Sequence, residues 1–250
     1  MNPVLKVQNL KVAIEDEEIL HGVDLEIGRG ETHLLFGPNG SGKTTLMMTL
    51  MGFPKYVITG GQILFKGEDI TGMPVNERVK LGLGISFQRP PTIRGVTTRR
   101  LVEICSKEDI DVERLADEMD LVSHLDRDIN LGFSGGEIKR AELLQLLAQG
   151  PDLVLLDEPE SGVDLENMSL IGNSIKKLLK KDRPYRERKD DDGRSSLIIS
   201  HTGHILDYIT ADVGHVMCGG VMGCSGNPRE LLSEIRRMGY EECIRCQIQS

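Results

Sequence analysis

The sequence of 250 residues lacks several features that would assign it to a particular class of protein. Its apolar runs are all shorter than the roughly 20 residues that cross a bilayer, so we expect no direct insertion into a membrane. Its first residues, MNPVLKVQNL, lack the charged-then-apolar pattern of a secretion signal, and we therefore expect a cytoplasmic protein. The formal net charge of -9 argues against unspecific binding to nucleic acid or acidic lipid, because both need a basic surface.

Cysteine is scarce, and its pattern does not indicate a disulfide framework. A chain of this size does not need disulfides to be stable, so an odd number of cysteines predicts reduced thiols. Cys243 and Cys246 have a C-x-x-C spacing, which is half of a metal site, and no second pair with matching spacing accompanies them. We expect an exposed, reduced tail there, with metal or cluster binding as the alternative. The five cysteines are Cys105, Cys218, Cys224, Cys243 and Cys246.

Apolar residues are abundant enough for a large core. Hydrophobic residues make up 39% of the chain, which suits one large α/β domain or a core that carries a small subdomain. Residues 4–36 have the pattern of short strands, and residues 43–52 that of a helix that Gly52 ends. The runs DLVLLDE and SLIISH do not alternate between apolar and polar residues, which is typical of strands in a parallel sheet covered on both faces.

The composition changes after the run GISFQ, which we predict to be a strand that ends at Gln88. Pro90, Pro91 and Gly95 break regular structure, and residues 97–128 are polar with a helical pattern. The sequence therefore predicts a helical subdomain inserted into the α/β core. The expected buried side of this insert consists of Leu101, Ile104, Leu115, Met119 and Val122.

The run FGPNGSGKTTL matches a complete phosphate-binding loop. Gly37, Gly42, Lys43 and Thr44 satisfy the pattern G-x-x-x-x-G-K-[ST], between a predicted strand and a predicted helix. The glycines let the main chain wrap around phosphate oxygens, the lysine neutralises the β- and γ-phosphates, and the threonine hydroxyl is a ligand for Mg²⁺. The predicted phosphate-binding residues are Gly37, Pro38, Asn39, Gly40, Ser41, Gly42, Lys43, Thr44 and Thr45.

Polar residues follow three of the predicted core strands, where ligands of open α/β sheets collect. Asp157 and Glu158 end the run LVLLDE; the first is suited to hold Mg²⁺ through water and the second to orient and partly deprotonate an attacking water. His201 ends LIISH, and a single histidine in this position is more often a hydrogen-bonded structural residue than a catalytic one. With the phosphate loop present, we predict that it contacts the γ-phosphate or the water. Gln88 is predicted to sense the metal and the water.

A second glycine-rich segment, FSGGE, precedes the helical pattern of residues 135–150. Adjacent glycines at a helix start can bind an anion through main-chain N–H groups. If the helical insert holds this segment away from the first phosphate loop, it can reach only an ATP bound to another copy of the chain.

The order of these elements resembles that of the ABC ATPases: phosphate loop, Gln88, FSGGE, LVLLDE, SGVD and His201. The resemblance covers nearly the whole chain. It implies an α/β fold with a P-loop NTPase core, an antiparallel β region and an inserted α-helical subdomain. The implied parts are residues 1–88 and 132–238 for the two halves of the ATP-binding core, 89–131 for the helical subdomain and 239–250 for a C-terminal tail.

The same resemblance implies an ATP-dependent head-to-tail homodimer that hydrolyses ATP with Mg²⁺. Each ATP would lie between the phosphate loop of one subunit and Ser134, Gly135 and Gly136 of the other. The implied catalytic residues are Glu158, His201 and Gln88, the implied metal ligands are Thr44, Gln88 and Asp157, and Asp164 would lie in a loop that couples the two sites.

Within the ABC ATPases, the segments SGGEIKRAELLQ, GISFQRPPTIRGV and ESGVD look similar to the SufC type of the Suf iron-sulfur cluster assembly system. This resemblance implies SufB/SufD-like scaffold partners. The chain departs from the SufC type in a short helical insert and in a longer, charged stretch at residues 180–196, which we predict to be a surface loop. Ile14 takes the place of the aromatic residue that stacks on adenine in many transporter ATPases.

Two other functions are compatible with these motifs. One is the ATPase subunit of a membrane importer, with the insert gripping a transmembrane partner. The other is a regulatory module that binds ATP without turnover, against which the presence of Glu158 and His201 argues.

Overall fold

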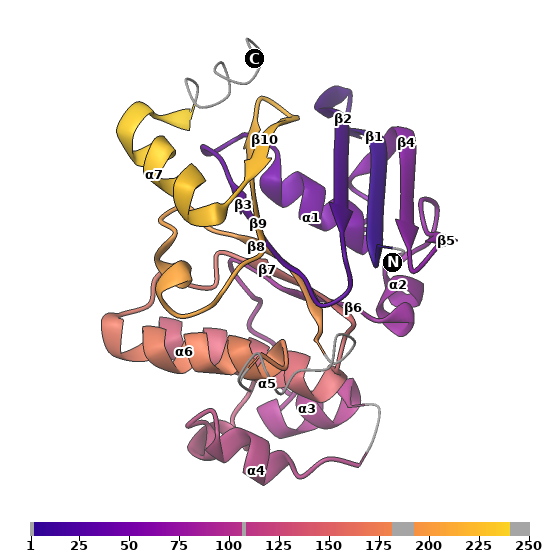
Figure 1. The fold of residues 1–250 in the computed structure, drawn as a ribbon. Helices are drawn as coiled ribbons and strands as arrows, with labels where there is room; N and C mark the ends of the chain where they lie inside the picture. The colour runs from indigo at the N-terminus through magenta and orange to yellow at the C-terminus, as the bar shows by residue number, and fades with distance from the viewer. Residues whose placement is uncertain (1–2, 107–108, 182–192, 241–250) are drawn as a thin grey trace.

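The computed structural model describes residues 3–106, 109–181 and 193–240, and it contains two β-sheets that pack against each other (Figure 1). The smaller sheet is antiparallel and has the strand order β2-β1-β4-β5. Its strands are β1 (Leu5–Ile14), β2 (Glu17–Ile27), β4 (Val57–Phe65) and β5 (Glu68–Asp69). The predicted antiparallel β region is therefore present.

The larger sheet has the order β10-β9-β3-β8-β7-β6, and all of its strands except β10 are parallel. Non-consecutive neighbours such as β3 and β8 mark the crossovers of an open α/β sheet. The strands are β3 (Thr32–Phe36), β6 (Leu83–Ser86), β7 (Leu153–Asp157), β8 (Ser195–Ile199), β9 (Val213–Cys218) and β10 (Val221–Gly226).

The helices begin and end where local capping signals stand. Side chains of Thr97, Asp111 and Asp164 accept hydrogen bonds from the first main-chain N–H groups of α3, α4 and α6, and Gly52 ends α1 in the left-handed region. The helices are α1 (Lys43–Met51), α2 (Val75–Leu81), α3 (Thr98–Cys105), α4 (Val112–Asp117), η1 (Val122–His124), α5 (Gly135–Gln149), α6 (Leu165–Leu178), η3 (His204–Asp207) and α7 (Pro228–Met238). None of the helices in the described ranges is both long and apolar enough to span a bilayer.

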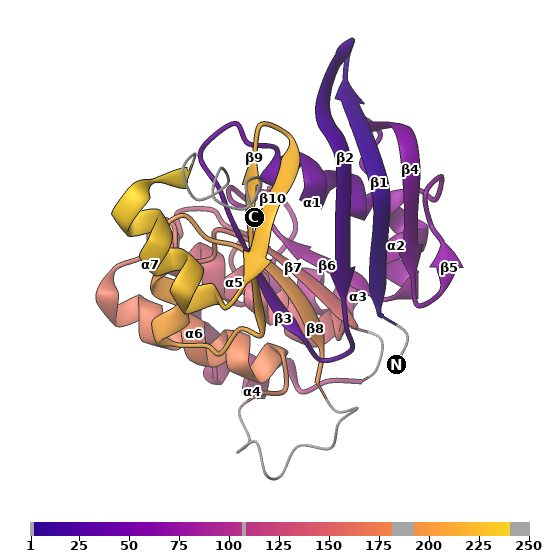
Figure 2. The same cartoon turned by 45° about the horizontal axis from the view of Figure 1, so that its top comes forward.

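The core has two parts, one on each face of the larger sheet. Leu34 and Leu156 belong to the part beneath α5, α6 and α7, whereas Leu35 and Leu155 belong to the part that faces α1 and the antiparallel sheet (Figure 2). Because successive side chains of a strand point to opposite faces, a strand covered on both sides needs apolar residues throughout. This explains the unalternating runs in the sequence.

The prediction for the buried side of the helical insert is partly wrong. Met119 is buried, but the side chains of Ile104 and Val122 are 62% and 49% exposed. A single helical period does not run through residues 97–128, because turns separate the short elements α3, α4 and η1. The residues that fill the core of the insert are instead Val102, Val112, Ala116, Leu121 and Leu125.

Two predicted strands end earlier than expected. Strand β6 ends at Ser86 and β8 at Ile199, so Gln88 and His201 both lie on loops two residues beyond their strands. After Ser86 the main chain bonds to a side chain of α5 rather than to a neighbouring strand, because Phe87 N donates to Glu142 Oε1 at 2.9 Å. The positions of Gln88 and His201 are therefore not set by strand pairing.

Parts of the predicted tail and charged loop lie outside the described residues. Cys243, Cys246 and residues 182–192 belong to these parts. The end of the predicted loop is not a loop, since β8 already begins at Ser195. The four-part division of the chain stays a prediction.

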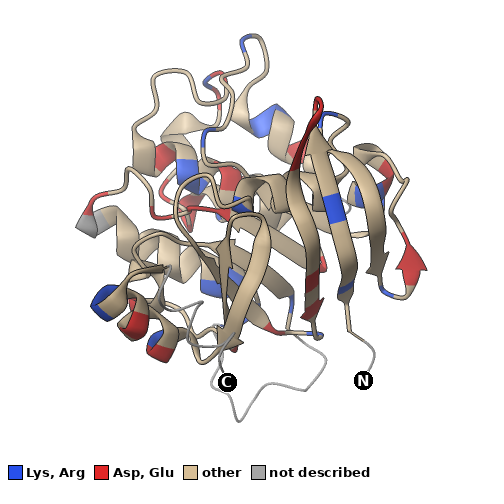
Figure 3. Ribbon diagram, turned by 90° about the horizontal axis from the view of Figure 1, so that it is seen from above, with Lys and Arg blue, Asp and Glu red and all other residues tan. Residues whose placement is uncertain are grey.

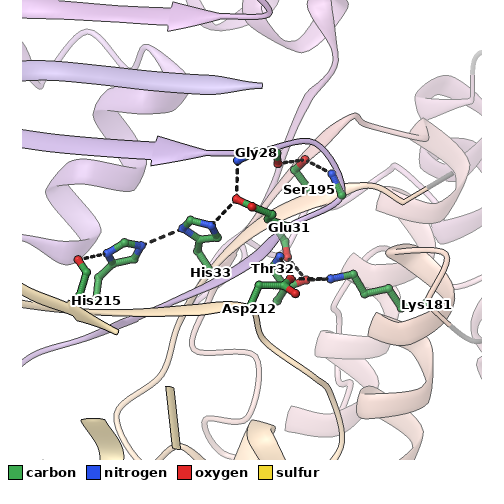
Figure 4. A network of polar contacts seen from close by, with 11 residues as sticks. Gly28, Glu31, Thr32, His33, Lys181, Ser195, Asp212 and His215 are labelled. Atoms are coloured by element: carbon green, nitrogen blue, oxygen red, sulfur yellow. Dashed lines mark hydrogen bonds and ion pairs between the residues drawn. The ribbon is translucent and has the colours of Figure 1, made fainter. Parts of the chain in front are cut away.

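A polar chain with two buried histidines begins at the amino end of β3 and connects β3, β9 and β10 (Figure 4). His33 Nε2 lies 2.9 Å from Glu31 Oε2, His33 Nδ1 lies 2.8 Å from His215 Nε2, and His215 Nδ1 lies 2.6 Å from Ser225 Oγ. Burial lowers the pKa of His33 and lowers that of His215 to about 4. Both imidazoles are therefore neutral at neutral pH, which suits a chain of single hydrogen bonds.

Charges are distributed over the whole ribbon. Acidic residues gather at the tip of the β1–β2 hairpin, where the sequence reads Glu15, Asp16, Glu17 and Glu18 (Figure 3). In this view, basic and acidic segments are interspersed over both sheets and the helices.

Candidate nucleotide-binding and active site

The phosphate loop connects the carboxyl end of β3 to the start of α1. Gly37 packs against β9 so closely that a Cβ atom there would lie 2.3 Å from the carbonyl oxygen of Met217, and Gly42 caps α1 with a φ of 101°. Neither position accepts a side chain without strain. The glycines therefore bring main-chain N–H groups and the positive end of α1 to the same place, which is a site for phosphate.

Lys43 folds back over the phosphate loop. Its Nζ donates to the carbonyl oxygens of Gly37 and Pro38 at 2.9 and 2.8 Å, and to Ser41 Oγ at 3.3 Å. Burial lowers the pKa of Lys43, and this effect is opposed by the nearby carboxylates of Glu158 and Asp157. The loop thus holds a cation in a partly desolvated position, where a phosphate charge is a stronger partner than neutral carbonyl groups.

Thr44 and Asp157 meet beside the phosphate loop. Thr44 Oγ1 donates to Asp157 Oδ2 at 3.2 Å, while the buried Oδ1 of Asp157 has no hydrogen-bond partner among the described residues. Burial raises the pKa of Asp157, and the neighbouring Glu158 raises it further. A buried carboxylate oxygen without a partner, next to a hydroxyl, fits Mg²⁺, which prefers hard oxygen ligands.

Glu158 is held between two loop residues. Gln88 Nε2 donates to Glu158 Oε2 at 2.7 Å, and His201 Nε2 lies 2.6 Å from Glu158 Oε1. The φ of Glu158 is 49°, a strained value for a residue with a Cβ atom, which turns the chain sharply after β7. The loops that follow β6, β7 and β8 therefore meet at one carboxylate.

A cavity of about 460 Å³ lies above the phosphate loop. Ile14 and Ile19 of the antiparallel sheet form its apolar side, which is the side available to a nucleotide base. Gly37, Pro38 and Asp157 do not line this cavity, but each is hydrogen-bonded to a residue that does, the first two to Lys43 and the third to Thr44. The predicted site residues that line this cavity are Asn39, Gly40, Ser41, Gly42, Lys43, Thr44, Thr45, Gln88, Glu158 and His201.

The segment Ser134–Gly136 does not line this cavity in the described part of the chain. Ser134 caps α5 in a capping box, in which Ser134 N donates to Glu137 Oε2 at 2.6 Å. The segment packs instead against the loop after β7, since a Cβ atom on Gly135 would lie 2.6 Å from the carbonyl oxygen of Gly162. Asp164 caps α6 beside it.

A second cavity, of about 500 Å³, shares Glu158 and His201 with the first. Glu160 lines it and accepts a hydrogen bond from Ser200 Oγ, and burial raises the pKa of Glu160. Glu158 and His201 therefore line both cavities.

Sequence reasoning missed three residues at this site. Ile19 was assigned only to a strand, and Lys139 and Glu142 were read as part of a helical pattern, although both contact the Gln88 loop. Charged residues on a helix are usually solvated, so the helical pattern alone did not mark them. Their spacing of three residues within a mostly apolar helix was the available signal.

The comparisons with known proteins agree with this geometry. Residues 20–161 match the protein family described as ABC transporter. The chain is 38% identical over 254 residues to vegetative protein 296 of Bacillus subtilis strain 168, covering 95% of this chain and 92% of that protein. It is 36% identical over 251 residues to a probable ABC transporter ATP-binding protein of Streptococcus pyogenes serotype M18, covering 95% and 93%.

A solved structure has the same fold and a related sequence. It is the ADP conformation of an ATP-binding cassette of an ABC transporter, with a TM-score of 0.76 and 25% identity, covering 97% of this chain and 98% of that one. ATPases of this family function as dimers with partner subunits. The phosphate loop, the partnerless oxygen of Asp157 and these relatives together show that the chain belongs to the ABC ATPase family and is a Mg²⁺-dependent enzyme that hydrolyses ATP.

Proposed function

We propose that this ATPase is the energy-converting subunit of a cytoplasmic, SufC-like assembly, in which ATP drives conformational change in a soluble iron-sulfur cluster scaffold. The proposal rests on the contacts made by residues of the SufC-like segment of α5. Lys139 bonds to the Gln88 loop, and Arg140 NH1 donates to the carbonyl oxygen of Met119 at 2.9 Å in the helical insert. The SufC-like segment of α5 thus contacts both regions, with Lys139 at the Gln88 loop and Arg140 at the helical insert.

The scaffold would dock where the insert meets the Gln88 loop. A groove of about 240 Å³ lies there, with mainly apolar walls. Ile93, which lines it, is 38% exposed, as expected for a surface that a partner covers. We assign this groove to a SufB/SufD-like scaffold subunit. Its lining includes Ile85, Phe87, Pro90, Pro91, Ile93, Leu101, Cys105 and Ile129.

For hydrolysis, we assign the phosphates of ATP to the phosphate loop and Lys43. Glu158 would accept a hydrogen bond from the attacking water and orient it toward the γ-phosphate, and His201 and Gln88 would fix the position of the Glu158 carboxylate. Thr44, Gln88 and Asp157 would hold Mg²⁺, which supplies positive charge to the phosphate oxygens. The contacts of Glu158 with Gln88 and His201 support these roles.

We further propose a head-to-tail homodimer that encloses two ATP molecules. Ser134, Gly135 and Gly136 start a 15-residue helix, yet none of them lines the cavity at the phosphate loop of the same subunit. The helix start is suited to bind phosphate, so we assign it to the ATP of the partner subunit. Asp164, in the loop against which this segment packs, would couple the two sites.

The second candidate function is the ATPase subunit of a membrane transporter, which the names of several relatives favour. Affinity purification of the tagged protein under anaerobic conditions distinguishes the two. We expect a detergent-independent complex with soluble partners whose absorption spectrum shows an iron-sulfur cluster. A complex that forms only with membrane proteins in detergent would instead support the transporter function.

A further inference from the structure

We propose that Lys139 and Glu142 are positioning residues of the ATPase site, acting as a clasp that holds the main chain at residues 86–88 and, through Gln88, the carboxylate of Glu158. The proposal rests on the roles assigned above to Gln88 and Glu158. It adds a direct connection within one subunit between α5, which begins at Ser134, and the catalytic carboxylate.

The clasp consists of several hydrogen bonds to the loop after β6. Lys139 Nζ donates to the carbonyl oxygens of Phe87 and Gln88 at 2.7 and 3.1 Å. Glu142 accepts from Phe87 N at 2.9 Å and from Ser86 Oγ at 2.8 Å. The two charged groups lie 3.9 Å apart, so they support each other while they hold the loop from both sides.

The clasp continues into the active site through one side chain. Gln88, whose carbonyl oxygen Lys139 binds, places its Nε2 2.7 Å from Glu158 Oε2. A change in the position of the Gln88 main chain therefore changes the position of the group that bonds to Glu158. Lys139 and Glu142 do not line the cavity above the phosphate loop, and their hydrogen bonds reach Glu158 through this loop. Burial lowers the pKa of Lys139, and the charges of Glu142, Asp157 and Glu158 oppose this effect, so Lys139 also lies within electrostatic range of Glu158.

The burial of the pair argues against an ordinary surface ion pair. Lys139 is 4% exposed and Glu142 is 6% exposed. Burial lowers the pKa of Lys139 and raises the pKa of Glu142, so each charge is unfavourable there without the other. Apolar residues at these positions would satisfy packing, but they would leave the N–H and carbonyl groups of the Gln88 loop without partners.

Because Lys139 and Glu142 lie on α5, the clasp couples the start of this helix to the Gln88 loop. Ser134 caps α5, and Lys139 and Glu142 are the fifth and eighth residues of the same helix, three residues apart and hence on one face. A helix of this kind moves as a rigid element. A nucleotide that draws in the start of α5 therefore displaces the Gln88 loop of the same subunit, and with it Glu158.

The test begins with three single variants of the full-length protein, which are compared with the unchanged protein. Lys139→Met removes the donor to the Gln88 loop, and Gln88→Ala removes the contact with Glu158. Arg140→Met is the matched control, because Arg140 is the next residue on α5 and is 5% exposed, but binds Met119 and Asp120 in the helical insert. Steady-state ATP hydrolysis gives kcat and KM, and denaturant unfolding gives the stability of each variant.

We expect Lys139→Met to lower kcat by roughly tenfold to a hundredfold, because a displacement on the order of 1 Å at a reacting group has such an effect. KM for ATP should change little, since the phosphate loop is intact. Lys139→Arg should restore much of kcat, because it keeps a cationic donor. Arg140→Met should lose comparable stability and keep kcat.

The double variant Lys139→Met/Gln88→Ala provides the decisive comparison. If Lys139 acts through Gln88, the kcat of the double variant should be no lower than that of Gln88→Ala alone. Once the Gln88 side chain is gone, the loss of Lys139 has no further contact with Glu158 to disturb. Multiplicative losses would overturn the proposal. If Lys139→Met does not fold, Glu142→Gln carries the same comparison, since it keeps the volume of the side chain.

The single variants separate this inference from the proposed function. If Gln88→Ala leaves kcat unchanged, the role assigned to Gln88 is wrong. If Gln88→Ala lowers kcat and Lys139→Met does not, the role of Gln88 stands and the clasp alone is refuted.

Discussion

The two ends of strand β3 carry polar groups that are organised in opposite ways. A chain of Glu31, His33 and His215 begins at its amino end, and in it both imidazoles are buried and each ring nitrogen has a partner (Figure 4). Beyond its carboxyl end, Lys43 binds carbonyl groups of its own loop, and Asp157 at the carboxyl end of β7 keeps a buried oxygen that has no partner among the described residues. The histidine chain has all its hydrogen-bond partners in the folded protein. The group around Lys43 and Asp157, a few residues further along the sheet, needs a ligand to supply the missing partners.

The closed arrangement has a defined direction. The carboxylate of Glu31 can only accept, so His33 Nε2 donates to it and His33 Nδ1 accepts from His215 Nε2. His215 Nδ1 is then left as the acceptor for the Ser225 hydroxyl. A complete set of donors and acceptors leaves nothing for a ligand, and its effect is to join β3, β9 and β10.

The group around Lys43 and Asp157, the open arrangement, lacks some hydrogen-bond partners because its polar atoms must be available to bind phosphate and Mg²⁺. A carboxylate with a buried, partnerless oxygen costs stability in the folded protein. The contrast teaches that unsatisfied polar atoms mark the functional end of this sheet, whereas buried charge or histidine alone does not.

The largest expected effect concerns the open end. Glu158→Gln should lower the rate of ATP hydrolysis by about 10²- to 10⁴-fold, because the group that orients and deprotonates the attacking water is lost. ATP should still bind, and a dimer should accumulate with ATP and Mg²⁺. Phosphate release and size-exclusion chromatography measure the two results. A variant that stays monomeric at saturating ATP would contradict the sandwiched dimer.

The next prediction asks whether the open end is completed by a second copy of the chain. Ser134→Arg and Lys43→Ala should each be inactive alone, because every site of either homodimer contains one damaged half. Mixing the two proteins should restore part of the activity, since each heterodimer then has one site with both halves intact and one site in which both halves are damaged. If mixing restores nothing while heterodimers form, the assignment of Ser134 to the neighbouring site is wrong.

A third prediction is that acid destabilises the closed end, the chain that contains His33 and His215. The pKa of His215 is about 4 when folded and near 6.5 when unfolded, so the unfolded chain binds the proton first as the pH falls. The stabilisation is complete above pH 6.5 and is lost between pH 6.5 and 4, by roughly 3 kcal/mol.

Denaturant unfolding at pH 7.5 and pH 4.5 measures this loss. His215→Gln should have a smaller difference in unfolding free energy between the two pH values than the unchanged protein. His21→Gln is the control, because His21 is an exposed histidine of β2. Equal differences in all three proteins would show that His215 does not carry the pH dependence.

The smallest expected effect concerns the base side of the cavity, where Ile14 and Ile19 provide only aliphatic contact. Ile14→Tyr should tighten ATP binding by about 1 kcal/mol, roughly fivefold, because an aromatic ring can stack on the base. Titration with a fluorescent ATP analogue measures the affinity. An unchanged affinity would mean that the base does not lie against Ile14.

Much of the site was predictable from short segments. The phosphate loop, Asp157 and Glu158 follow from motifs of a few residues, and the helix ends follow from caps such as Ser134 and Gly52. The structure differs from the predictions where they depended on more than a few neighbouring residues. Ile104 and Val122 are exposed because turns interrupt the helical period, and the strands β6 and β8 stop short of Gln88 and His201.

The sequence by itself determined the kind of chemistry, because a phosphate loop and a strand that ends in two acids need only neighbouring residues. Tertiary structure decided which distant groups meet: Glu142 with Phe87, His33 with His215, and Gln88 with Glu158. It also decided that Ser134 stays outside the cavity of its own subunit. The physical reason is range. Caps and periodicity act within a few residues, whereas the packing of α5 against the sheet brings the Glu142 carboxylate to the main-chain N–H of Phe87 and the side chain of Ser86, which are 55 and 56 residues away in the sequence.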